Sequence, residues 1–133
     1  MPTILKHDDF VSPELNYQLV GCAYDVYNEL GFRHLEKYYQ RAYAVSLDNK
    51  NLTIKEQVYF PLKFKEVVIG RSYFDFLVDE KIIVELKKDN RFSKKHIDQV
   101  NEYLQVSNLK LALLINFIKS RVVYLRVLNV NKS

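Results

Sequence analysis

The chain has 133 residues, a length that suits a single domain with one core. That domain is expected to span residues 1–133, with its core elements within residues 13–127. Hydrophobic residues make up 48% and charged residues 27%, a globular composition that excludes disorder of the whole chain. The net charge is +4, a single cysteine excludes an intrachain disulfide, and no apolar run approaches the roughly 18 residues that a membrane helix needs.

The first third of the chain has helical periodicity. Ser12 is a good N-cap, apolar residues recur every three or four positions after it, and Gly31 stands where a C-cap glycine belongs. This pattern predicts a helix over residues 13–30. A second helix is predicted from near His34 to the turn-rich residues 48–51. Its apolar stripe is expected to comprise Leu35, Tyr38, Tyr39, Ala42 and Val45.

The middle of the chain changes to a period of two, which is typical of strands. Gly70 interrupts a short apolar run over residues 67–69, and the polar residues 79–81 read as a turn. The predicted strands are residues 54–62, with Pro61 near the end, 72–78 and 81–86.

The last third returns to a helix and then to strands. Ser93 caps a helix over residues 93–106, and the apolar runs 111–117 and 122–127 read as strands, the first of them buried. A helix that joins two strands of one sheet normally makes them parallel. The sequence therefore predicts an α/β (α+β) fold in which helices flank a mixed central sheet.

The hairpin before residue 87 is the most informative feature. If its turn is centred on Glu80, Leu77 lies opposite Ile83. In the same register Asp75 lies opposite Glu85, with Cβ atoms about 4.5–5.5 Å apart. Two carboxylates so close repel each other, and a divalent cation is the natural compensation.

Lys87 follows Glu85 by two residues, so alternation places it on the same face, about 7 Å further along the strand. The alternative is that these are solvated edge charges, with Lys87 neutralising the carboxylates. The opposite, apolar face is expected to carry Ile82, Val84 and Leu86.

Asp75, followed after nine residues by Glu85-Leu86-Lys87, matches the Asp…(Asp/Glu)-x-Lys signature of the PD-(D/E)xK nuclease superfamily. The chain resembles the bacterial and archaeal GxxExxY proteins of that superfamily. It departs from them at Arg33, where the naming glycine is expected, and at His34, where an aromatic residue is expected. Phe74 stands where the superfamily signature has proline. The matching segments are residues 29–31, 35–39, 75–78, 83–87, 96–99, 101–104 and 113–117.

The resemblance implies a restriction-endonuclease-like core in the order αβββαβ and a site for Mg²⁺ or Mn²⁺. Asp75, Glu85 and the backbone carbonyl of Leu86 would bind the metal, with Glu36 in support. Lys87 would act on the attacking water or stabilise the transition state. The catalytic residues implied by the resemblance are Asp75, Glu85, Lys87, Glu36 and Gln99.

Charge and aromatic residues point to a polyanionic partner. The first 30 residues carry −4 and the remainder +8, and residues 110–133 have five basic side chains and no acidic one. A basic loop before and at the start of the third helix is a candidate for phosphate contacts, although a merely solvated loop is the alternative. Most tyrosines are expected in the core. The expected nucleic-acid contacts are Lys88, Arg91, Lys94, Lys95, Tyr39 and Tyr73, with Tyr43 as a further stacking candidate.

The third helix carries His96, Gln99 and Tyr103 on one face. From the residues alone this stripe reads as solvent-facing, whereas the resemblance places Gln99 in the site. Residues 1–10 lack a signal-peptide pattern, so a cytoplasmic protein is expected.

The functional hypothesis is a Mg²⁺-dependent nuclease that acts on DNA or RNA, with a homodimer possible and no membrane partner. One alternative is a catalytically silent nucleic-acid-binding module on the same fold. The other is a protein-interaction or assembly protein whose basic patch is incidental.

Overall fold

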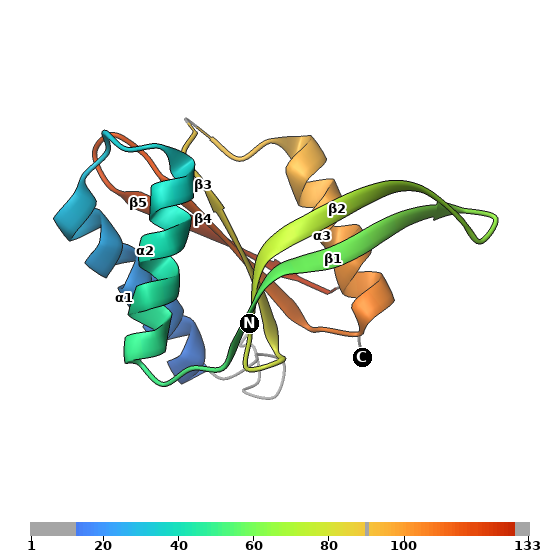
Figure 1. The fold of residues 1–133 in the computed structure, drawn as a ribbon, viewed down its shortest axis with the longest axis horizontal. Helices are drawn as coiled ribbons and strands as arrows, with labels where there is room; N and C mark the ends of the chain where they lie inside the picture. Colours follow the sequence, from blue (N-terminus) through green and yellow to red (C-terminus); the bar gives the residue numbers. More distant parts are fainter. Residues whose placement is uncertain (1–12, 90, 130–133) are drawn as a thin grey trace, which may run out of the picture.

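The computed structural model describes residues 13–89 and 91–129, so the expected N-cap Ser12 lies outside the described part. Its element order is the predicted one: two helices, three strands, one helix and two strands (Figure 1). The elements are α1 Pro13–Leu30, α2 Glu36–Asn49, β1 Ile54–Phe64, β2 Val67–Val78, β3 Ile82–Lys87, α3 Lys94–Ser107, β4 Leu111–Phe117 and β5 Val122–Leu128.

The five strands form one sheet in the order β1-β2-β3-β4-β5. β3 and β4 are parallel, and the other neighbouring pairs are antiparallel. The parallel pair is joined by α3, as the crossover argument predicts. The mixed sheet and its flanking helices confirm the predicted fold class.

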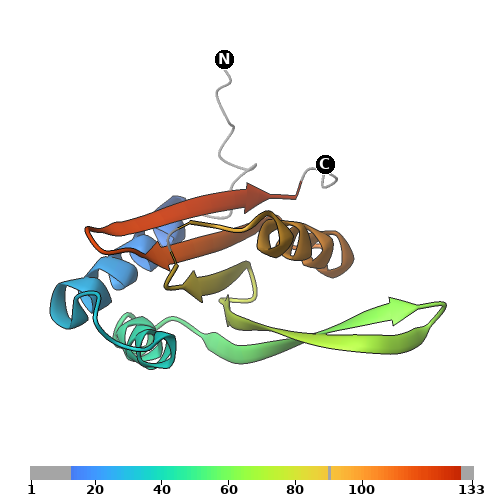
Figure 2. The ribbon, with the colours of Figure 1, turned by 90° about the horizontal axis from the view of Figure 1, so that it is seen from above.

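Helices cover both faces of the central strands (Figure 2). α1 and α2 pack on one face against Ile82, Val84 and Leu86, which confirms the predicted apolar face of β3. α3 packs on the other face against Ile83 and the even-numbered positions of β4. β3 and β4 are therefore buried on both sides, which is why their sequences are nearly continuous apolar runs. No helix of the described residues is long and apolar enough to cross a membrane.

The stripe predicted for α2 is correct at Tyr39 and Ala42, which lie in or against the core, and wrong at its other positions. The buried aromatic residues of the helix are Tyr39 and Tyr43, one turn apart, followed by Leu47. Their hydroxyl groups are also satisfied, since Tyr43 donates to the Leu19 carbonyl at 2.8 Å. A buried tyrosine needs a hydrogen-bond partner for its hydroxyl group, and Tyr39 and Tyr43 both have one, so their large rings can fill the core. The exposed residues of the predicted stripe are Leu35, Tyr38 and Val45.

β1 and β2 are longer than predicted, and their outer halves project beyond the rest of the sheet as a two-stranded ribbon (Figures 1 and 2). Gly70 lies within β2, beside a shift in register between Leu62 and Lys63 of β1. Pro61 lies inside β1 because β1 is an edge strand, where a missing N–H need not break a ladder. This ribbon consists of residues 58–64 and 67–74.

Candidate active site

The β2–β3 hairpin has the predicted register. Leu77 pairs with Ile83, and the three-residue turn 79–81 has Asp79 and Glu80 in the left-handed conformation. The backbone pairing of β2 with β3 ends at Phe76 and Val84. Asp75 and Glu85 are the next residues away from the turn.

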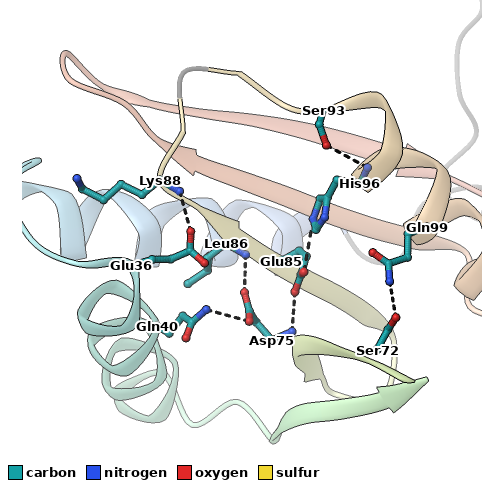
Figure 3. A network of polar contacts seen from close by, with 10 residues as sticks. All are labelled: Glu36, Gln40, Ser72, Asp75, Glu85, Leu86, Lys88, Ser93, His96 and Gln99. Atoms are coloured by element: carbon teal, nitrogen blue, oxygen red, sulfur yellow. Dashed lines mark hydrogen bonds and ion pairs between the residues drawn. The ribbon is translucent and has the colours of Figure 1, made fainter. Parts of the chain in front are cut away.

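Side chains continue the ladder where the backbone pairing ends (Figure 3). The Asp75 amide donates to Glu85 Oε1 at 2.6 Å, and the Leu86 amide donates to Asp75 Oδ2 at 2.8 Å. The structure therefore brings the two predicted carboxylates together, with each carboxylate accepting a bond from the opposite strand. In an extended strand the N–H and C=O of one residue point to the same edge, so the Leu86 carbonyl also lies on the side of Asp75.

Asp75 sits where β2 switches faces. Phe74 packs in the core under α3, whereas Phe76 packs in the core under α1 and α2. On the neighbouring strand Gln57 has a φ of 54° and is missing from the register between its neighbours. The twist leaves the Asp75 side chain between the layers, where Gln40 of α2 donates to Oδ1 at 3.1 Å.

Burial disfavours the ionised forms of both carboxylates, and the charge of Asp75 adds to this effect at Glu85. Asp75 is 8% exposed and Glu85 6%. Burial raises the pKa of Asp75, and the hydrogen bond from the Leu86 amide opposes that rise. Burial, followed by the charge of Asp75, raises the pKa of Glu85 to about 8. The raised pKa values of Asp75 and Glu85 mean that the positive charge around them does not compensate for the cost of burying two carboxylates.

Lys87 provides part of that counter-charge from the end of β3. Its ammonium lowers the pKa of both carboxyl groups, although less than burial raises them. Its strand neighbour is Asn116 of β4, a fully buried residue whose Oδ1 accepts from the Asp89 amide at 2.8 Å. Lys87 is half-buried.

α3 presents His96 and Gln99 to the sheet, not to solvent, which corrects the prediction made from the residues alone. His96 Nε2 lies 3.4 Å from Glu85 Oε2. Burial and then the charge of Lys87 lower the pKa of His96. Gln99 donates to the hydroxyl of Ser72 on the ribbon, at 2.5 Å.

Tyr103, the third member of that stripe, is also buried and packs on Phe74, with ring centroids 4.7 Å apart. Gln99 contacts Ser72 and none of the carboxylates through a hydrogen bond in the described residues, so its role in the site stays a prediction. Its bond to Ser72 joins α3 to the ribbon three residues before Asp75.

Glu36, the first residue of α2, lies close enough to Asp75 for its charge to raise the pKa of that group. Its Oε1 accepts from the backbone amide of Lys88 at 3.2 Å. Glu36 thus ties α2 to the segment that follows β3, at the same end of the sheet as the carboxylate pair (Figure 3).

The predicted nucleic-acid contacts fall into separate groups. Arg91, Lys94 and Lys95 are exposed, and Lys94 is paired with Asp98 at 2.8 Å. The ammonium of Lys88 lies over a different group, with its nitrogen 3.9 Å from the centre of the Phe32 ring.

Of the predicted stacking residues, only Tyr73 has an accessible ring. Tyr39 is completely buried, donates to the Gly31 carbonyl at 2.5 Å and packs on Phe117, so its prediction as a nucleic-acid contact is wrong. Tyr43 is also completely buried. Tyr73 is 52% exposed. The expectation that most tyrosines lie in the core is wrong, because the exposed ones are Tyr17, Tyr24, Tyr38, Tyr59, Tyr73 and Tyr124.

Sequence reasoning missed three residues that shape the site: Gln40, Ser72 and Asn116. Gln40 follows Glu36 by one helical turn, which is the spacing that could have pointed to it. Ser72 carries no comparable signal, whereas Asn116 is the polar residue of a strand predicted to be buried, which could have pointed to it.

The comparisons with known proteins give the family of the chain. The family model described as "PD-(D/E)XK nuclease superfamily" matches residues 13–127. The chain belongs to the PD-(D/E)XK nuclease superfamily. No curated protein matches the chain. Among solved structures, it is similar to one titled "Crystal structure of SSO0001", with 12% identity, a TM-score of 0.47, and coverage of 90% of this chain and 79% of that chain.

Nucleases of the PD-(D/E)XK superfamily generally use divalent metal ions. No group of three or more His, Cys, Asp or Glu side chains in residues 13–89 and 91–129 is arranged to hold a metal ion. The donors available are two carboxylates, whose hydrogen-bonded oxygens each keep a free lone pair, and one backbone carbonyl. Mg²⁺ is commonly held by one or two carboxylates and keeps several waters, so this donor set fits such an ion.

Proposed function

We propose that the protein is a metal-dependent nuclease that hydrolyses phosphodiester bonds, and that it belongs to the GxxExxY branch of its superfamily. The observation that supports this most strongly is the pair Asp75 and Glu85. Both are buried, both have raised pKa values, and they are linked by hydrogen bonds across the end of a hairpin. Such a pair is unfavourable by itself and becomes favourable when it binds a cation.

In this proposal Asp75, Glu85 and the Leu86 carbonyl hold Mg²⁺ or Mn²⁺. The bound ion lowers the pKa of a water and neutralises charge on the phosphate. Glu36 contributes indirectly, because its carboxylate fixes the Lys88 amide beside the pair. Gln40 holds Asp75 in position through a bond to Oδ1.

Lys87 follows the metal ligands on β3 and has the side chain best placed to act on substrate. The residue is half-buried and its charge acts on both carboxylates, so it can meet the negative charge that develops on the phosphate oxygens. A charge held in a partly water-excluded site stabilises the transition state more than a solvated one does. Lys87 is therefore proposed to contribute mainly to rate.

The test is cleavage of DNA and RNA, single- and double-stranded, with Mg²⁺, Mn²⁺ or EDTA. Wild type is expected to cut at least one substrate with metal and none in EDTA. Asp75→Asn and Glu85→Gln are expected to abolish cutting, whereas the exposed control Glu102→Gln on α3 leaves it unchanged. If wild type cuts nothing with either metal, the nuclease proposal is wrong, and retained nucleic-acid binding would then favour the silent binding module.

A further inference from the structure

The ribbon carries an aromatic surface that the proposed chemistry does not use. Tyr59 of β1 and Tyr73 of β2 are cross-strand partners with ring centroids 5.5 Å apart. They are 46% and 52% exposed. The residues that follow the two tyrosines, Phe60 and Phe74, point to the opposite face of the ribbon and are buried against α3. The strands are thus held by their buried face, while the two tyrosines on the opposite face are open to solvent.

The aromatic surface adjoins the carboxylate pair. Tyr73 precedes Asp75 by two residues, which is about 7 Å along a strand. A single nucleotide spans this distance. The same stretch of β2 is fixed to α3 by the bond from Gln99 to Ser72, so the tyrosines are held in place relative to the site.

Charge on this face suits a phosphate backbone. Register places Arg71 on the tyrosine side of the ribbon, and alternation along β1 places Lys63 there; both are exposed. Lys65 at the tip adds a third exposed cation, offset by its neighbour Glu66. A basic track interleaved with accessible rings is the usual composition of a surface that binds single-stranded nucleic acid.

We propose that the face of the ribbon bearing Tyr59 and Tyr73 is a stacking platform for a single strand of nucleic acid. The inference rests on the proposed function in taking Asp75 and Glu85 as the place of the scissile phosphate, so a base stacked on Tyr73 would belong to an adjacent nucleotide. Stacking on a ring needs an unpaired base with a free face, which a duplex does not offer along its length. A second copy of this chain is a poorer occupant, because Pro61 removes a donor from the edge strand that would have to pair.

The experiment measures binding without cleavage. Fluorescence anisotropy in EDTA at low salt is recorded with a labelled 15-nucleotide single strand and with the duplex of the same sequence. The variants are Tyr59→Val, Tyr73→Val and the double change, because β-branched valine keeps a strand while it removes the ring. Tyr124→Val is the matched control, since Tyr124 is 49% exposed on the far edge strand β5.

Stacking on an aromatic side chain contributes about 1–3 kcal/mol per base, which corresponds to a loss of about 5- to 150-fold in affinity when the ring is removed. Each ribbon valine variant is expected to lose at least about 5-fold for the single strand, whereas Tyr73→Phe and the Tyr124→Val control stay close to wild type. The slope of affinity against salt is expected to be unchanged by the valines. It should fall by about 0.7 in Arg71→Gln, which removes one charge.

Three results would overturn the inference. The first is that the double valine variant binds the single strand as well as the Tyr124→Val control does. The second is that the duplex binds more tightly than the single strand and depends on the same tyrosines. The third is that wild type forms a dimer that the valines dissociate, which would assign the surface to a second copy.

Failure of this inference and failure of the nuclease proposal give different results. If the double valine variant cuts and binds like wild type, the platform is wrong and the nuclease proposal stands. If the valines abolish binding but wild type never cuts, the platform stands and the nuclease proposal is wrong. Circular dichroism melts of each variant establish that the fold is retained.

Discussion

Replacement of Glu85 by glutamine tests the electrostatic origin of the site. The pKa of Glu85 rises from an ordinary 4.5 to about 8, so the folded protein holds a proton that the unfolded chain releases. The free energy of unfolding therefore falls as pH rises from about 4.5 to about 8. Each pKa unit corresponds to about 1.4 kcal/mol, which makes the loss at pH 7 about 3 kcal/mol. Because Glu85 and Asp75 titrate as a pair, part of this amount belongs to Asp75.

Glutamine keeps the shape of the side chain and the acceptor for the Asp75 amide, but it has no proton to lose. In EDTA at pH 7 we expect Glu85→Gln to be about 1–3 kcal/mol more stable than wild type, or roughly 3–10 °C higher in Tm. The gain should disappear near pH 4.5. Urea denaturation at several pH values, with Glu102→Gln as the exposed control, measures both effects. A Glu85→Gln variant that is clearly less stable than wild type at pH 7 would refute the reasoning, because it would mean that the carboxylate is a structural anion.

Three further predictions follow from the site. Mn²⁺ should bind wild type weakly and Asp75→Asn more weakly still in titration calorimetry, and equal binding would remove Asp75 from the metal site. Lys87→Ala should slow cleavage about 10²-fold or more with little change in affinity. Joint replacement of Lys94 and Lys95 by alanine should weaken binding and its salt dependence, while the rate at saturating substrate is kept. The reverse pattern would exchange the roles of Lys87 and the two helix lysines. Tyr39→Phe should lower stability by about 1 kcal/mol in a thermal melt without altering nucleic-acid affinity, and a loss of affinity with unchanged stability would restore Tyr39 as a contact.

Local pattern was enough to predict most of the fold. Helical and strand periodicities give the element order, because each element buries one face or both and its sequence carries the corresponding period. The hairpin turn at residues 79–81 set the register that brings Asp75 to Glu85, since pairing from a short turn leaves little freedom. Lys87 follows from the same strand. These positions depend on neighbours in the chain, which a sequence displays.

Other features depend on contacts between distant segments and were decided only by tertiary structure. The stripe of α2 could be read in more than one rotation, and packing chose the one that buries Tyr39 and Tyr43. α3 turns His96 and Gln99 toward the sheet, although a polar stripe alone suggests solvent. The sequence by itself therefore determined the order of elements and the acidic pair. Tertiary packing decided which polar groups surround that pair, because a side chain's burial and partners are set by elements that lie far away along the chain.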